Sequence, residues 1–386
     1  MRLPLLAAVL AAVPALAACT QNTTADTASE DHRTVTVSST DDGCELSSTE
    51  APSGKLTFDV TNDGSTVTEF YLYTEDADRI VGEVENIGPN LTRQLVVSAP
   101  PGTYVTACKP GMKGDGIRAD FTVTDSGEKV AASADEQQMV EHAQDEYGEF
   151  VQHESDRLLV GTRAFVAAYT SGNDRLARKL YPEVRTHWER IETVAESFGD
   201  LDPKMDAREA DLESGQNWTG WHRIEKDLWP ARAEHYTALT TRQRAEVAHA
   251  LLADTRTLDG RIGKLDFTVD QIANGSRGLM EEVATGKVTG EEEYWSRTDL
   301  WDFQANVDGA KQAFEVLEPV LERNDPALEE TLDQRFDALQ KLLDAQRDGD
   351  GFRSYDELSD AQVKRLADAV NALSEPLSHL TAAVVS

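Results

Sequence analysis

The chain has 386 residues, which is too long for one small domain, so two or three domains are expected. Apolar residues make up 40% of the sequence, enough for ordinary hydrophobic cores, and this excludes a disordered acidic protein. The 70 acidic and 37 basic residues give a net charge of −33, which argues against nucleic acid as a partner. A chain with this negative charge attracts cations. The alternative is that the acidic surface only keeps the protein soluble.

Residues 1–18 are predicted to be an export signal, because one basic residue precedes a short apolar run that ends in small residues. The run closes with Leu-Ala-Ala-Cys, which resembles a bacterial lipobox, so we expect Cys19 to be lipidated and to become the first mature residue. The alternative is an ordinary signal peptide cut at an A-x-A site. Residues 19–33 predict a flexible tether, and no other segment is apolar enough to span a membrane. The protein is therefore expected outside the cytoplasm, anchored to a membrane surface.

Residues 34–126 alternate between short apolar-polar runs and turn residues, as in GKLTFDVTNDG and GIRADFTVTD. Seven such runs within about ninety residues predict a β-sandwich. Residues 127–138 are polar and predict a linker into the next domain.

Two cysteines of this β domain, Cys44 and Cys108, leave two interpretations open. A disulfide is the usual outcome in an exported chain. The ACKPGM segment, just before the last of the seven runs, instead resembles the ligand loop of cupredoxins. Residues 33–130 contain no histidine, however, which excludes the His2Cys ligand set of a blue-copper centre. A metal site here would have to use thiolate, thioether and carboxylate ligands. Its candidate ligands are Cys44, Cys108, Met112, Glu69, and Glu85 or Glu83.

Residues 139–386 show apolar residues at helical spacing and predict an all-α domain, which by its size should contain two packed helical bundles. Within it, GWHRIEKDLW places His222 and Glu225 three residues apart, on one face of a helix, where both can contact one cation. A solvated pair is the alternative, but the flanking tryptophans indicate a buried helix, in which polar side chains need partners. The upstream segment HWERIETVAESFGDLDPKMD supplies carboxylates. They are Glu189, Glu192, Glu196, Asp202 and Asp206.

The same residues argue against a peptidase. No H-E-x-x-H motif is present to hold zinc, no G-x-S-x-G motif is present, and the helical domain has no cysteine. A site rich in carboxylates with one histidine favours iron, with zinc as an alternative, and fits binding better than catalysis.

Four segments together resemble the EfeO-type branch of the imelysin-like family: GWHRIEKDLW, HWERIETVAESFGDLDPKMDARE, LMEEVATGKVTGEEE and TDLWDFQANVDGA. The resemblance implies an N-terminal cupredoxin-like domain followed by two four-helix bundles with the H-x-x-E motif in the cleft between them. It implies His222 and Glu225 as metal ligands, with Glu189 and Asp202 as acidic companions. It also implies iron (Fe3+ or Fe2+), with copper or zinc as alternatives, and two partners, a membrane iron permease and a haem-peroxidase-like protein.

We therefore expect a lipoprotein that captures iron outside the cytoplasm and delivers it to a permease. Two alternatives remain at this point: a metallopeptidase of the imelysin-like family, and a polysaccharide-binding surface protein that uses the six tryptophans of the helical domain.

Overall fold

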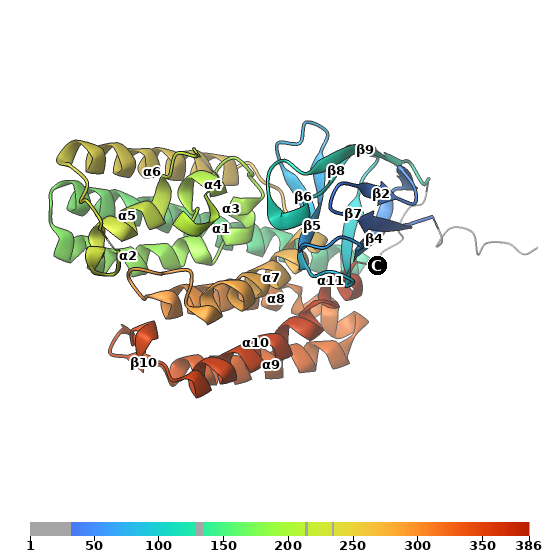
Figure 1. The fold of residues 1–386 in the computed structure, drawn as a ribbon. Helices are drawn as coiled ribbons and strands as arrows, with labels where there is room; N and C mark the ends of the chain where they lie inside the picture. The colour runs from blue at the N-terminus through green and yellow to red at the C-terminus, as the bar shows by residue number, and fades with distance from the viewer. Residues whose placement is uncertain (1–31, 128–133, 213–214, 234, 386) are drawn as a thin grey trace, which may run out of the picture.

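The computed structural model describes residues 32–127, 134–212, 215–233 and 235–385. The predicted signal peptide and Cys19 lie outside these residues, as do most of the predicted tether and part of the linker. The described chain is a β-sandwich followed by a helical domain, so the fold class predicted from the sequence is confirmed (Figure 1).

The sandwich consists of two sheets with strand orders β2-β1-β4-β7 and β3-β9-β8-β5-β6. Alternating residues of the strands fill its core, as Leu56, Phe58 and Val60 of β4 do, all fully buried. The seven predicted runs all form strands, and the two shortest strands, β2 and β3, were not predicted. The strands are β1 (Thr34–Ser39), β2 (Cys44–Leu46), β3 (Glu50–Pro52), β4 (Gly54–Asn62), β5 (Thr68–Thr74), β6 (Ile80–Ile87), β7 (Thr92–Ala99), β8 (Gly102–Cys108) and β9 (Ile117–Thr124).

A disulfide joins Cys44 of β2 to Cys108 of β8, with their Cα atoms 5.6 Å apart. Because β2 and β8 belong to different sheets, this bond ties the two layers of the sandwich together. The disulfide is thus the alternative that the structure adopts, and it differs from the thiolate site considered above, since neither sulfur is free to ligate a metal.

The helices form two four-helix bundles. The first contains α1 (Ala134–Thr170), α2 (Asp174–Glu189), α5 (Gly220–Leu228) and α6 (Thr241–Ile262). The second contains α7 (Val269–Thr285), α8 (Asp299–Asn324), α9 (Pro326–Asp344) and α10 (Asp360–Leu377). Helix α8 packs on α1 and α2 and so forms the seam between the bundles. Shorter elements are α3 (Glu192–Glu196), α4 (Asp202–Met205), α11 (Leu380–Val384), the 3-10 turns η1 (Pro110–Met112), η2 (Glu209–Asp211), η3 (Pro230–Arg232), η4 (Lys287–Thr289) and η5 (Tyr355–Glu357), and a hairpin of β10 (Arg347–Asp348) and β11 (Gly351–Phe352).

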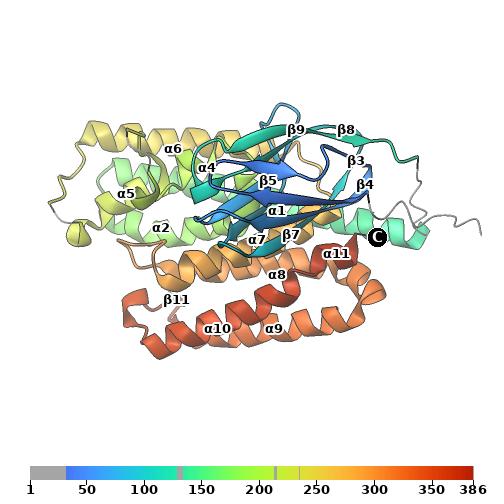
Figure 2. The same cartoon turned by 45° about the vertical axis from the view of Figure 1, so that its right-hand side comes forward.

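The sandwich lies against the helical domain mainly through α7 (Figure 2). The Arg277 guanidinium donates hydrogen bonds to the carbonyl oxygens of Gln94 and Glu83, and the Asn274 amide donates to that of Val96. Edge backbone groups of β6 and β7 are therefore satisfied by helix side chains, which fixes how the two domains meet. A cavity remains at this interface, lined from both sides by acidic residues that include Glu83, Glu85, Glu196 and Glu282. Among the described helices, none is both long and apolar enough to cross a membrane.

The disulfide should stabilise the sandwich, because it closes a loop across a sequence separation of 64 residues. Replacing both Cys44 and Cys108 by serine should lower the free energy of unfolding by about 2–4 kcal/mol, as measured by urea denaturation. Thiol titration of the unreduced, denatured protein provides the control: reactive Cys44 and Cys108 thiols would contradict the bond.

Candidate metal centre

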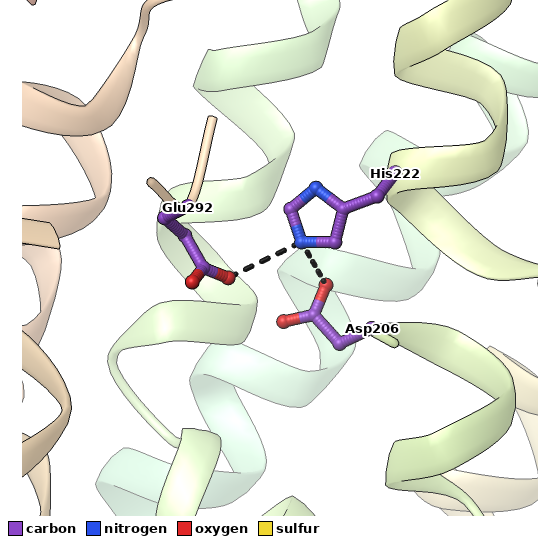
Figure 3. A group of neighbouring side chains, drawn as sticks. All are labelled: Asp206, His222 and Glu292. Atoms are coloured by element: carbon purple, nitrogen blue, oxygen red, sulfur yellow. Dashed lines mark hydrogen bonds and ion pairs between the residues drawn. The ribbon is translucent and has the colours of Figure 1, made fainter. Parts of the chain in front are cut away.

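The predicted helix around His222 is α5, and the histidine side chain is fully buried at the seam between the two bundles. Its Nε2 atom lies 3.2 Å from Glu292 Oε1 and 3.4 Å from Asp206 Oδ1, so two carboxylates from other segments converge on one ring nitrogen (Figure 3). Asp206 follows α4, and Glu292 lies in the loop between η4 and α8. Chain segments up to 86 residues apart thus supply the three side chains of one cluster of potential metal ligands, Asp206, His222 and Glu292.

Glu225 holds the other side of the ring. Its Oε2 lies 3.2 Å from His222 Nδ1, while its Oε1 accepts hydrogen bonds from the backbone N–H groups of Trp295 and Ser296 at 2.9 and 2.6 Å. The structure therefore brings the two residues of the H-x-x-E motif together, as the shared helix face predicts. Glu225 also connects α5 to the loop that carries Glu292, which orients the imidazole ring.

A second cluster, made of three carboxylate side chains, lies directly beside the cluster of His222, Asp206 and Glu292. Ligand-capable oxygens of Glu189, Glu192 and Asp206 lie within 4.8 Å of one another, and all three side chains are buried. The Asn306 amide of α8 donates to Glu189 Oε2 at 3.2 Å and to Glu192 Oε2 at 2.9 Å. Asp206 belongs to both groups, so the two form one continuous centre.

Buried acid exceeds buried base in this centre. The fully buried permanent cations are Arg185 and Lys287. The partly exposed Arg208 lies 3.4 Å from Glu292, and His222 adds a further positive charge when protonated. Arg185 makes ion pairs with Asp206 and Glu189, and its Nε lies 2.8 Å from Glu293 Oε1. The opposing seven carboxyl groups, each at most 7% exposed, are Glu189, Glu192, Asp206, Glu225, Glu292, Glu293 and Asp302.

Burial of so much acid shifts several pKa values. Burial and the guanidinium of Arg185 lower the pKa of His222, but the neighbouring carboxylates Asp206, Glu225 and Glu292 outweigh them and raise it to about 10. The imidazole is therefore protonated in the metal-free protein and must lose a proton before it can ligate a metal. Burial also opposes ionisation of Glu292, but Lys287 and His222 hold its pKa well below the usual range.

Two glycines allow the backbones to approach closely enough to build the centre. Gly220 starts α5 with a φ of +86°, and a Cβ there would lie 2.2 Å from the carbonyl oxygen of Met205, next to Asp206. Gly309 of α8 faces the end of α2, where a Cβ would lie 2.3 Å from the Arg190 carbonyl oxygen. Both positions need glycine because the backbones that carry the site side chains touch there.

Asp202, predicted as an acidic companion, lies in the first turn of α4, close enough for its charge to interact with Asp206 and Glu192. Asp202 belongs to none of the four groups of potential metal ligands among the described residues, whereas Asp206 belongs to two of them. Burial, with the nearby charge of Asp206, raises the pKa of Asp202 to about 8. Asp202 is thus part of the acidic surroundings of the centre, four residues before the carboxylate that contacts His222.

The β-domain candidates are arranged differently. The Tyr71 hydroxyl lies 2.9 Å from both Glu69 Oε2 and Glu85 Oε1 and so bridges two of the predicted carboxylates. Met112 is 45% exposed on η1. With both cysteines in a disulfide, the residues predicted here retain only oxygen and thioether donors.

Several residues of the centre were not predicted from the sequence. Glu292 and Glu293 stand in an acidic GEEE run that looks like an ordinary solvated loop. The cations Arg185 and Lys287 were also not considered, although the Arg185–Glu189 spacing of four residues was a readable signal of an intrahelical ion pair.

The chain is thus a two-domain protein, in which a β-sandwich precedes two helical bundles with a buried candidate metal centre of carboxylates and one histidine between them. The imelysin family model matches residues 143–380, and the cupredoxin-like domain model matches residues 7–123. This chain belongs to the imelysin family.

Relatives match over nearly the whole length. The "Iron uptake system component EfeO" of Yersinia pestis is 37% identical over 354 residues, which cover 91% of each chain. The protein of the same name in Escherichia coli K12 is 34% identical over 349 residues, 90% of each chain. An "Efem/EfeO family lipoprotein" of Staphylococcus haemolyticus is 39% identical over 270 residues, covering 69% of this chain and 92% of the relative.

The raised pKa values predict that the metal-free protein loses stability as the pH rises. Burial raises the pKa of Asp202 from 3.8 and that of Glu282 from 4.5, each to about 8, so the folded state binds more protons than the unfolded state within this window. The stability is fully present below the ordinary values and is lost as the pH passes about 8. Thermal unfolding in the presence of a chelator should show a falling Tm from acid to mildly alkaline pH, and the slope should decrease in Asp202→Asn. A Tm that rises across this window would contradict these shifts.

The contact at Gly220 predicts a large effect of a small change. Gly220→Ala should lower the free energy of unfolding by about 2 kcal/mol or more, because the new methyl group meets the Met205 backbone in a left-handed conformation. Gly260→Ala, on the exposed side of α6 with open space around the new Cβ, is the matched control and should stabilise by roughly 0.5–1 kcal/mol. Equal effects in urea denaturation would refute the close approach.

Proposed function

We propose that this protein captures iron outside the cytoplasm as a component of a bacterial iron-uptake system and delivers it to a membrane permease. The observation that carries the proposal is the excess of buried carboxyl groups over buried cations around His222, because these groups can all ionise only if a further cation offsets their charge. A multivalent cation would neutralise it. The full-length similarity to relatives named as iron-uptake components supports iron as that cation.

The donor set suits iron better than softer metals. Oxygen atoms of Glu189, Glu192, Asp206 and Glu292 would form the metal's surroundings, with His222 as the one nitrogen donor. Hard carboxylate oxygens favour ferric iron, while the imidazole also suits Fe2+, and copper or zinc remain alternatives. Glu225, which the sequence predicts as a ligand, has one oxygen engaged by two backbone N–H groups, so its main contribution would be to orient the ring of His222.

The proposal includes a location at the membrane surface and two protein partners. A lipid on Cys19 would anchor the protein to the membrane beside its permease, and the lipoprotein name of the staphylococcal relative supports such an anchor. A haem-peroxidase-like protein would be the second partner, as the family resemblance implies.

The geometry of the centre supports neither of the two alternative functions. A metallopeptidase needs a carboxylate free to act as a base, whereas Glu225 accepts hydrogen bonds at both oxygens. The six tryptophans that suggested a polysaccharide site are all buried or partly buried. Trp188 and Trp221 are fully buried, and Trp229 contacts Tyr181 edge to face.

Metal titration tests the proposal. Wild-type protein should bind Fe2+ (under anaerobic conditions) and Fe3+ (supplied as a weak chelate), as measured by calorimetry. Asp206→Asn should weaken binding by about 10- to 100-fold, because it removes the carboxylate shared by both ligand groups. Asp202 is the ligand predicted from the sequence, whereas the geometry favours Asp206. Asp202→Asn should therefore lower the iron affinity less than Asp206→Asn does.

The matched control is Glu183→Gln, which lies on the same helix as Glu189 but is 42% exposed at its side chain. Its iron affinity should equal that of the wild type. Iron binding that survives Asp206→Asn unchanged would refute the assignment of this centre, and a wild type that binds no iron would refute the function.

A further inference from the structure

Lys287 is a fully buried lysine inside the carboxylate centre. It lies in η4, directly after α7, and its Nζ atom donates to both carboxylate oxygens of Glu192 at 3.0 Å. The same atom lies 3.4 Å from Glu189 Oε2. A positive charge thus occupies the space between two of the carboxylates that the metal would need.

The surroundings show that this place is built for a cation. Glu192 accepts from Lys287 with both oxygens, in the manner of a carboxylate that chelates a metal ion. The amide of Asn306 donates to Glu189 and Glu192 from another side, which fixes both carboxylates. Burying an ammonium group is costly, and here the two acids offset the cost. Burial opposes the charge of Lys287, but Glu189 and Glu192 keep its pKa well above the usual range.

Arg185, the other buried cation, is held differently. Several nitrogens of its planar guanidinium group form ion pairs, with Asp206, Glu189, Glu293 and Asp302. These contacts hold the Arg185 side chain in one position. Lys287 instead contacts its partners through one nitrogen, Nζ, at the end of a flexible stem, so its ammonium group can move by rotation about the bonds of that stem.

We propose that Lys287 is a tethered counter-ion, which holds the metal position in the metal-free protein and must be displaced when metal binds. The inference rests on the proposed function and deepens it, since it names a residue that sets affinity and selectivity. An ammonium ion and a metal ion cannot share the space between Glu189 and Glu192. A cation of charge two or three gains more from these carboxylates than the ammonium does, whereas sodium or potassium does not. Lys287 therefore makes the centre selective for multivalent cations.

The structure also provides a place for the displaced ammonium. Glu282 Oε2 lies 3.8 Å from the Lys287 Nζ atom, on the side of the interdomain cavity. Ligand-capable oxygens of Glu192, Glu196 and Glu282 lie within 4.8 Å of one another. A short movement of the lysine stem would thus bring the ammonium group to Glu196 and Glu282, whose carboxyl oxygens could accept hydrogen bonds from it.

Metal affinity of charge-removing and charge-keeping variants tests the proposal. Lys287→Met should bind Mn2+ about tenfold more tightly than the wild type or better, because the competitor is gone, and sodium should then compete with Mn2+. Lys287→Arg keeps a charge and should bind no more tightly than the wild type. Lys204→Met, which removes an exposed lysine 3.2 Å from Asp200, is the control for general loss of charge and should change the affinity by less than about twofold.

Unchanged or weaker Mn2+ binding by folded Lys287→Met would overturn the proposal. Wild-type protein that binds neither iron nor Mn2+ would instead refute the proposed function, so the two failures are distinguishable.

A measurement on wild-type protein covers the case in which Lys287→Met does not fold. Reductive methylation followed by peptide mass spectrometry should leave Lys287 unmodified in the metal-free protein, because its side chain is inaccessible. With saturating Mn2+ the lysine should become reactive as it moves into the cavity, while the reactivity of exposed Lys204 should stay constant. Lys287 that stays unmodified in metal-saturated protein would contradict the displacement.

Discussion

The constraint on which the centre depends is the burial of more carboxyl groups than cations between two helical bundles. Carboxylates removed from water need cations, and Arg185, Lys287 and the protonated His222 offset only part of the seven carboxyl groups that meet here, so burial raises the pKa of Glu189, Glu293 and Asp302. The surrounding architecture holds these groups together against their repulsion. Gly220 and Gly309 allow the backbones to touch, Glu225 ties α5 to the loop before α8, and Asn306 spans Glu189 and Glu192. Such a cluster of carboxyl groups would suit a metal ion, as proposed above.

The geometry around Glu225 supports the proposed binding over catalysis. Both of its oxygens have partners, which suits a residue that orients the imidazole ring of His222. The sandwich packs on α7, whose end carries Glu282, and η4 with Lys287 follows directly. Glu282 lines the acidic cavity between the domains and lies 3.8 Å from the Lys287 Nζ atom. The β domain therefore lies beside the path along which the Lys287 ammonium group is proposed to move.

Much of this fold could be predicted from the sequence, because alternating and helical periodicities are local signals. The H-x-x-E pair was also readable, since residues three apart on a helix share a face. Local patterns could not reveal which distant carboxylates would meet it: Glu292 lies 70 residues after His222 and reaches it only through the packing of α8 against α2. Asp202 and Asp206 are equivalent in the sequence, and only the end of α4 determines which of them faces the histidine. The buried cations were missed for a related reason, because a lysine or an arginine in a charged segment normally lies in solvent.

The most direct test of the central claim is an anomalous difference map at the iron edge from crystals of iron-loaded protein. The account predicts one strong peak at the seam between the bundles, within coordination distance of carboxylate oxygens of Glu192 and Asp206, with the Lys287 side chain moved away. A peak confined to the β domain, beside Glu69 and Glu85, would contradict it, and so would iron bound at the seam with no contact to these carboxylates.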